Sequence, residues 1–219
     1  YGVRLGVFLL YREVCIPRFR AFTARVERRA PPLAARIPFI FSCGLLYLAL
    51  AAPAVVTARL AAPSGVLGTA ATASIAATAV GFFVAALGDA VKTLVKAKEG
   101  EDALVTTGPF ALLRHPNYSG EMMAWCASPA AAFFTAAAAG SLRTVASWLA
   151  AATAGAAGMV YVLGKATANL EVRQELKYGG TAAFRDWRTR TWAGPQLKSL
   201  ERWPRVGGSS GAHRMAGRR

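Results

Sequence analysis

Acidic residues are scarce in this chain, which has 11 Asp and Glu against 26 Lys and Arg and a formal net charge of +15 over 219 residues. Charged residues of both signs make up only 17% of the sequence, whereas apolar residues make up 54%. This hydrophobicity excludes an intrinsically disordered chain. It leaves two classes open: a nucleic-acid binder with a basic surface on a soluble core, and a membrane protein whose apolar and basic residues are segregated along the chain.

Cysteine and histidine are also rare. The three cysteines (Cys15, Cys43 and Cys126) are scattered and odd in number, which excludes a disulfide framework. The two histidines, His115 and His213, are too few and too far from suitable partners to predict a zinc site, so we expect no bound metal. A G-x-G-x-x-G sequence followed by a distant acidic residue, which marks a soluble dinucleotide-binding domain, is absent as well.

Four long stretches contain no charged residue. They are Ile37–Ala58, Leu60–Gly88, Met122–Leu142 and Thr144–Gly164, of 22, 29, 21 and 21 residues. A membrane-spanning helix needs about 20 mostly apolar residues, and buried helices of soluble proteins usually keep a polar stripe. The stretches therefore predict an all-α, polytopic membrane helix bundle with spans at about 37–58, 66–88, 122–140 and 144–164. A soluble bundle with alanine-rich core helices is the alternative.

The basic residues are distributed unevenly around these stretches. Only Arg59 and Arg143 lie in the two short connections, after the first and third spans, while the other 24 basic residues lie before, between and after the span pairs. Four spans put those 24 residues on one side of the membrane, which the positive-inside rule makes cytoplasmic. The positive charge then has a topological explanation, and we expect no nucleic acid as a partner.

The flanking segments differ from the membrane domain, which we place at residues 37–206. Residues 1–36 are expected to be the tail of a truncated helix followed by a basic interfacial segment, since residues 12–36 contain seven arginines. Residues 207–219, rich in Gly, Ser and Arg, are expected to be a disordered basic tail.

Polar chemistry is concentrated in two segments that are both predicted to be cytoplasmic. In the first, Asp89 ends the second span, and Lys92 and Lys96 follow at spacings that place them on one helical face. A loop then carries Arg114, His115, Asn117, Tyr118 and Glu121, the last at the mouth of the third span. Such basic side chains suit phosphates, while Asn and Glu suit amide or ribose groups. The alternative is an interfacial loop with snorkelling Arg and Tyr.

The second polar segment follows the fourth span. Glu171, Gln174, Glu175 and Tyr178 recur at helical spacing, and Gly179-Gly180 is expected to end that helix. By itself this pattern is equally typical of an ordinary solvated helix. Its position on the same side as the first segment favours a shared site.

These residues resemble a known family. The sequence R-H-P-N-Y-S-G-E (114–121), preceded by Gly108-Pro-Phe and followed after three intervening residues by Trp125, resembles the signature of the steroid 5-alpha-reductase-like membrane proteins. Arg4-Leu5-Gly6 with Phe8–Arg12 is similar to an upstream stretch of the uncharacterised bacterial and plant branch. Glu171-x-Arg173 and Lys177-Tyr178-Gly179 are similar to the family's C-terminal tail. Sterol reductases and isoprenylcysteine carboxyl methyltransferases are related groups.

The resemblance implies a cofactor and its ligands. In the reductases, a set of residues in these segments contacts NADPH. The positions that match them here are Asp89, Lys92, Lys96, Asn117, Glu121, Arg173 and Tyr178. Together with Arg114, His115 and Tyr118 of the polar loop they form the predicted cofactor-binding set. Gly120-Glu121 favours the reductases, because the methyltransferases typically lack that Glu. The groups that polarise the substrate come from N-terminal helices in this family; Tyr11 and Glu13 lie there, but no motif assigns a catalytic residue.

We therefore expect an NADPH-dependent reductase that transfers a hydride to a conjugated double bond in a lipophilic, steroid-, sterol- or isoprenoid-like substrate. We expect an integral multi-pass protein in contact with membrane lipid, in the endoplasmic reticulum or another organelle membrane if the source is eukaryotic. Two alternatives remain: a methyltransferase that uses S-adenosylmethionine on a lipid or prenylated thiol, and a non-catalytic membrane scaffold.

Overall fold

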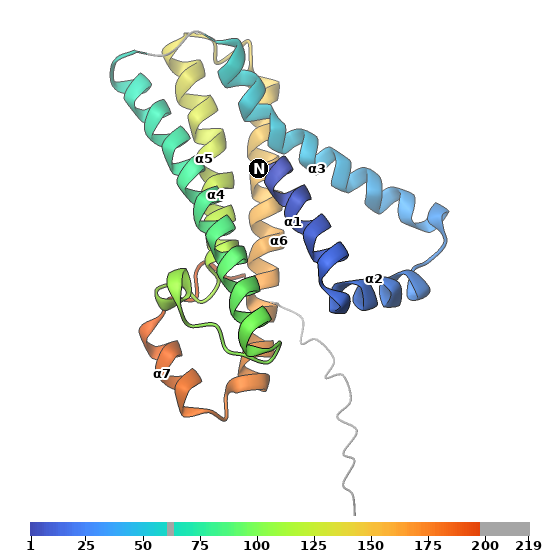
Figure 1. The fold of residues 1–219 in the computed structure, drawn as a ribbon. Coiled ribbons are helices and arrows are strands. Elements are labelled where there is room, and N and C mark those ends of the chain that lie inside the picture. The colour runs from blue at the N-terminus through green and yellow to red at the C-terminus, as the bar shows by residue number, and fades with distance from the viewer. Residues whose placement is uncertain (61–63, 198–219) are drawn as a thin grey trace, which may run out of the picture.

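The computed structural model describes residues 1–60 and 64–197, and within these ranges every regular element is helical. The elements are α1 (Gly2–Cys15), α2 (Pro17–Arg29), α3 (Leu33–Arg59), α4 (Gly65–Glu99), the short 3₁₀ helix η1 (Gly108–Ala111), α5 (Pro116–Ala138), α6 (Ala146–Tyr178) and α7 (Ala182–Arg190), as Figure 1 shows. The all-α prediction is confirmed. The predicted tail at 207–219 and the last part of the predicted membrane domain, 198–206, lie outside the described residues.

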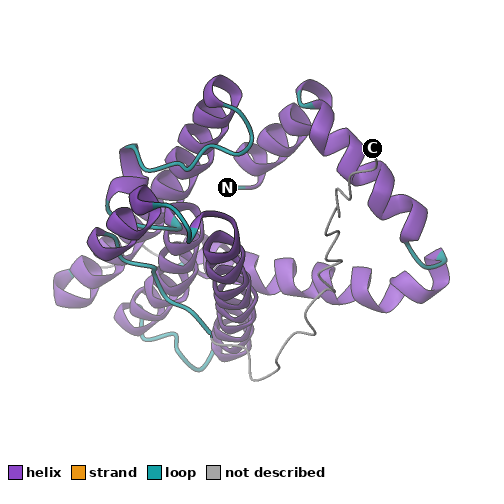
Figure 2. Cartoon of the chain, turned by 90° about the horizontal axis from the view of Figure 1, so that it is seen from below, coloured by secondary structure: helices purple, strands orange, loops and turns teal. Residues whose placement is uncertain are grey.

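Each charge-free stretch lies mostly within one of the four long helices α3 to α6, and α4 and α6 continue past their stretches to Glu99 and Tyr178. Of these, α3, α4 and α6 are long and apolar enough to cross a membrane, and no more than 28% of the most apolar window of each is buried by protein. Outer surfaces of this kind are compatible with a membrane protein. Helix α5, with 23 residues, is long enough to cross a membrane but is not apolar enough to be counted with these three. The case for a fourth span therefore depends on its position, since α5 lies beside α4 along its length (Figures 1 and 2).

Helix α5 is the central helix of the bundle, because it packs against α3, α4 and α6. Its closest approach is to α4, where Gly120 faces Gly81 with no side chain between the two backbones. Small residues allow such contact between membrane helices. The main core cluster, at the level of this crossing, consists of Leu50, Met122, Trp125, Met159 and Leu163.

The start of α5 corrects one prediction. We expected residues 114–121 to form a loop, but α5 begins at Pro116, so that Asn117, Tyr118 and Glu121 lie in its first two turns. Proline fits the first turn because its missing N–H would have no intrahelical acceptor there and its φ is already helical. His115 is the non-helical residue before it, with φ −133° and ψ 62°.

Both polar segments lie at the same end of the bundle. The last turns of α4 and α6, helix η1, the start of α5 and α7 gather there, while the end of α3, the start of α4 and the α5–α6 connection lie at the opposite end (Figure 1). Gly100, with φ 95°, ends α4 and turns the chain back, and Gly179 follows the last residue of α6 as predicted. All three cysteines are free.

Candidate functional site

A small polar cavity of about 50 Å³ lies between the ends of α4 and α6, the start of α5 and the loop that follows α4. Seven of the ten predicted cofactor-binding residues line it: Lys92, Lys96, Arg114, His115, Asn117, Tyr118 and Tyr178. Gln174 lines it too, and its buried Oε1 has no hydrogen-bond partner among the described residues. The cavity therefore combines four basic or imidazole side chains with an unused acceptor.

The other three predicted residues lie outside this lining. Asp89 is one helical turn before Lys92; its Oδ1 accepts a hydrogen bond from Asn117 Nδ2 at 3.2 Å. Glu121 lies one turn further along α5 than Asn117 and accepts a hydrogen bond from the Tyr1 hydroxyl at 3.1 Å. Arg173 is exposed on α6. Asp89 is thus linked to the cavity through Asn117, whereas Arg173 is not part of the lining.

Helix α1 supplies two side chains that sequence reasoning missed. Arg4 Nη1 donates to Asp89 Oδ2 at 2.8 Å, and the ring of Tyr1 packs against Phe82 and Trp125 with centroid distances of 4.7 and 5.1 Å. The indole N–H of Trp125 is buried and has no acceptor among the described residues. Tyr1 and Arg4 thus place a hydroxyl and a guanidinium against Glu121 and Asp89, two partly buried carboxylates next to the cavity.

Tyr11 and Glu13, the two α1 residues considered in the sequence as candidates for polarising the substrate, do not lie at the cavity. Tyr11 is exposed, and Glu13 accepts a hydrogen bond from Thr23 of α2 at 3.0 Å. Arg4 belongs to the upstream stretch that resembles the family, and this resemblance is the sequence signal that could have placed Arg4 of α1 in the candidate site. Nothing in the sequence paired it with Asp89, 85 positions away.

Glu171 of α6 holds the start of α5 in place. Its Oε1 accepts from Arg114 Nε at 3.0 Å and lies 2.6 Å from His115 Nε2, although His115 is only 3% exposed. Burial alone would raise the pKa of Glu171, but the hydrogen bond with His115 and the charge of Arg114 outweigh it, so the pKa of this carboxyl lies below its ordinary value. The sequence pattern places Glu171 on a helical face but gives no sign of these partners.

Replacing Glu171 by Gln should make the protein less stable at neutral pH and less sensitive to acid. Because the folded-state pKa is lowered, the carboxylate stabilises the fold fully above its unfolded pKa, and this stabilisation is lost as the pH falls through the lower folded value. We expect a loss of roughly 3 kcal/mol at pH 7 from breaking a mostly buried ion pair. Unfolding curves at pH 7 and in steps below pH 5 would measure it.

The matched control for that experiment is Glu175→Gln, one turn further along α6. Glu175 pairs with Arg188, but both side chains are about half exposed, so the loss should stay within roughly 1 kcal/mol. Equal effects of the two substitutions at pH 7, or an unchanged acid profile in Glu171→Gln, would contradict the structural role of the Arg114–Glu171–His115 cluster.

The loop after α4 covers the cavity. Three side chains hold it there: Lys96 and Tyr178 of the predicted cofactor-binding set, and Lys177 next to Tyr178. Lys96 Nζ donates to the carbonyl groups of Glu101 and Ala103, the latter at 3.4 Å. The Tyr178 hydroxyl donates to the same Ala103 carbonyl at 3.3 Å, and Lys177 pairs with Asp102. The loop therefore accepts hydrogen bonds from groups that could otherwise bind an anion.

The segment from η1 to residue 115 is fastened to the C-terminal part of the chain. Trp187 of α7 donates its indole N–H to the Phe110 carbonyl at 2.7 Å, and Leu113 and Trp192 form an isolated parallel bridge. Arg114 Nη1 donates to the carbonyl groups of Arg188 and Thr191 at 2.9 and 3.0 Å. Arg114 is thereby oriented by α6 and by the end of α7 at once.

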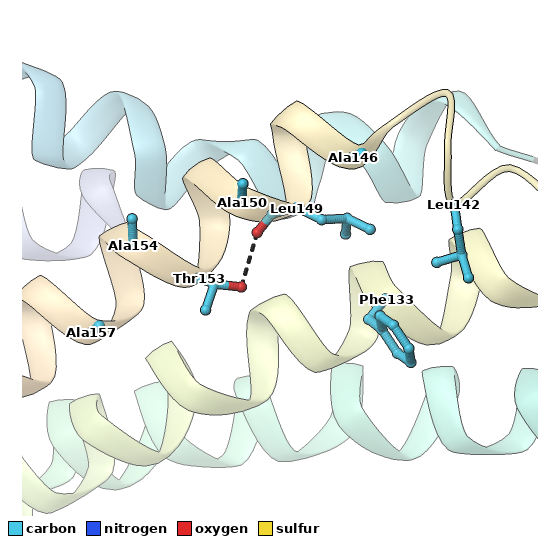
Figure 3. A pocket seen from close by; sticks show the side chains of 8 residues that line it. All are labelled: Phe133, Leu142, Ala146, Leu149, Ala150, Thr153, Ala154 and Ala157. Carbon is cyan, nitrogen blue, oxygen red and sulfur yellow. Dashed lines mark hydrogen bonds between the residues drawn. The ribbon is translucent and has the colours of Figure 1, made fainter.

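A larger, apolar groove of about 590 Å³ lies at the opposite end of the bundle, between α5 and α6. Figure 3 shows its lining, from Phe133 of α5 and Leu142 of the connection to a row of alanines on α6, with Thr153 bonded to the Leu149 carbonyl of its own helix. It carries no titratable side chain. We place the candidate site at the smaller polar cavity, because the chemistry lies there.

Fold and site together define a class: a helical protein with three helices able to cross a membrane and a buried polar cavity at one end of the bundle. The chain belongs to a family of proteins of unknown function, DUF1295, whose family model matches residues 1–191. No curated protein and no solved structure gives a significant match. Within the described residues no group of three His, Cys, Asp or Glu side chains gathers as a metal site would require.

Proposed function

We propose that the protein is a membrane-embedded, NADPH-dependent reductase of a conjugated double bond in a lipophilic substrate, within the steroid 5-alpha-reductase-like group that its sequence resembles. The observation that carries the proposal is the gathering of Lys92, Lys96, Arg114, Asn117 and Tyr178 around one polar cavity at the end of an apolar bundle. These residues come from α4, α5, α6 and the segment just before α5, and the resemblance selects most of them independently of any geometry.

The side chains present suit a dinucleotide. Lys92 and Lys96 would hold phosphates, the amide of Asn117 would bind a polar ring or ribose group, and the unpartnered Oε1 of Gln174 would accept a hydrogen bond from an amide or amino group. When bound, NADPH supplies the hydride. The cavity, at about 50 Å³, is small beside ligand pockets of roughly 300–1,000 Å³, so we propose that residues 100–107 move away when the cofactor enters.

The groups next to the cavity suit a substrate that arrives from the bilayer. Tyr1 holds a phenolic proton against Glu121, and the N–H of Trp125 is a buried donor that finds no acceptor in the part of the chain that the structure describes. Either could donate to a carbonyl oxygen of the substrate and stabilise the negative charge that develops there when the conjugated bond is reduced. Phe82 and the Tyr1 ring supply an apolar surface beside these donors.

Titration of the purified protein with NADPH, NADH and S-adenosylmethionine tests the proposal. Saturable NADPH binding would support it. Binding of S-adenosylmethionine alone would replace it by the methyltransferase alternative, and binding of none of the three by a folded protein would favour the non-catalytic scaffold.

Two substitutions should weaken NADPH binding without unfolding the protein. In Asn117→Ala a lining amide is removed, and in Glu121→Gln a carboxylate becomes a neutral amide of the same shape. Each lost hydrogen bond to a ligand costs roughly 1–3 kcal/mol, or about five- to 150-fold in affinity. Isothermal titration with NADPH measures the loss, with circular dichroism to verify folding. Parent-like affinity in both variants would mean that the cofactor binds elsewhere.

A further inference from the structure

Helix α2 is amphipathic and its apolar side is uncovered. Phe19, Phe22 and Val26 recur at spacings of three and four residues, which places them on one side of the helix. Phe22 and Val26 are 58% and 50% exposed, although both are large and apolar. Within the described residues α2 packs chiefly against α1, to which Thr23 is tied through Glu13.

The remaining surface of α2 is strongly basic. Five arginines, against the single acidic residue Glu27, lie on its thirteen residues, and Arg20, Arg25, Arg28 and Arg29 are exposed. Arg12 of α1 adds a further guanidinium at the same corner, stacked 3.6 Å from the centroid of the Phe19 ring. The face therefore combines apolar side chains with a concentrated positive charge.

The orientation of α2 distinguishes it from the long helices. It runs across the direction of α4, α5 and α6, at the lower ends of α1 and α3 in Figure 1, on the side where the polar cavity lies. If the long helices follow the membrane normal, α2 lies parallel to the membrane surface. A basic helix with an apolar stripe in this position suits the interface of a leaflet that carries anionic lipids.

We propose that α2 is a docking helix for anionic phospholipid, with Phe22 and Val26 inserted at the level of the acyl boundary and with Arg25 and Arg29, which flank this apolar stripe, on lipid phosphates. The charge of the helix selects anionic over zwitterionic lipid, and its position anchors α1, which carries Tyr1 and Arg4 to the cavity. This surface stands independently of the reductase proposal, because it requires no cofactor.

Spin labels on α2 in lipid nanodiscs test this. Cys15, Cys43 and Cys126 are first replaced by Ala, and single cysteines are then introduced as Phe22→Cys, Val26→Cys and the matched control Ala24→Cys, which lies on the opposite side of the helix and is exposed. Collisions with oxygen, which concentrates in the bilayer, are compared with collisions with a water-soluble nickel complex. In phosphatidylserine-containing discs, labels at 22 and 26 should favour oxygen several-fold relative to the label at 24.

The lipid dependence decides between outcomes. In phosphatidylcholine discs the preference of positions 22 and 26 for oxygen should fall, because this lipid has no net charge to attract the arginines. It should also fall in phosphatidylserine discs at high salt, because the attraction is already screened beyond about 8 Å at physiological ionic strength and added salt shortens that distance. The variant Arg25→Gln/Arg29→Gln should lose the difference between the two lipids. Equal immersion in both lipids would overturn the selection for anionic headgroups. Water-like exposure of 22 and 26 in phosphatidylserine discs would overturn docking and favour a protein or nucleic-acid partner.

Discussion

Replacing Gly120 by Ala should destabilise the bundle by about 3 kcal/mol, the upper end of the usual cost of overpacking. A Cβ at Gly120 would lie 2.5 Å from the Gly81 carbonyl oxygen and 2.8 Å from the backbone nitrogen of Ala85. Neither obstacle is a movable side chain, so α4 and α5 would have to separate. Because Asn117 and Asp89 bridge these same helices, their hydrogen bond should lengthen and NADPH binding should weaken together with stability.

Gly44→Ala is the matched control for Gly120→Ala. Gly44 also lies inside a long helix, α3, but a Cβ there would meet nothing within 4 Å. Alanine has the higher helix propensity, so this change should be neutral or slightly stabilising. Unfolding in a denaturing-detergent titration measures both variants. Similar midpoints for the two would show that the α4–α5 contact is not as close as the structure has it.

Replacing Lys96 by Gln should remove the proposed preference for NADPH over NADH. The 2′-phosphate is the group that distinguishes the two cofactors, and a hydrogen bond to a charged group contributes roughly 1.5–3 kcal/mol, or about 10- to 150-fold in affinity. We expect NADPH affinity to fall by that factor and NADH affinity to change much less. Titrations with both nucleotides at low and high salt measure it, and the parent's preference should shrink as the salt rises.

The control for Lys96 is Lys98→Gln, two residues along the same helix. Lys98 is exposed and does not line the cavity, so its loss should change neither affinity appreciably. If Lys98→Gln weakened NADPH binding as much as Lys96→Gln, the effect would come from the general positive charge of this end rather than from the cavity. A parent protein with equal affinity for both nucleotides at low salt would contradict the expected preference itself.

The sequence alone determined the four long helices and the end of the bundle at which the chemistry gathers. Charge-free stretches near the span length can satisfy their backbone groups only as helices in lipid, and the segregation of 24 basic residues indicated which connections share a side. Lys92 and Lys96 line one cavity because residues four apart lie on the same face of a helix, and this spacing can be read directly from the sequence. The same is true of the stop at Gly179.

Only the tertiary structure decided which polar groups meet. The pairing of Glu171 with His115, of Arg4 with Asp89 and of Tyr1 with Glu121 joins residues 56 to 120 positions apart. Such pairs depend on the angles and depths at which helices pack, which a 3.6-residue period does not encode. The glycine contact between α4 and α5 sets the separation of those helices, and with it the distance between Asp89 and Asn117. The start of α5 at Pro116 likewise turned an expected loop into a helix that carries Asn117, Tyr118 and Glu121 on a rigid support.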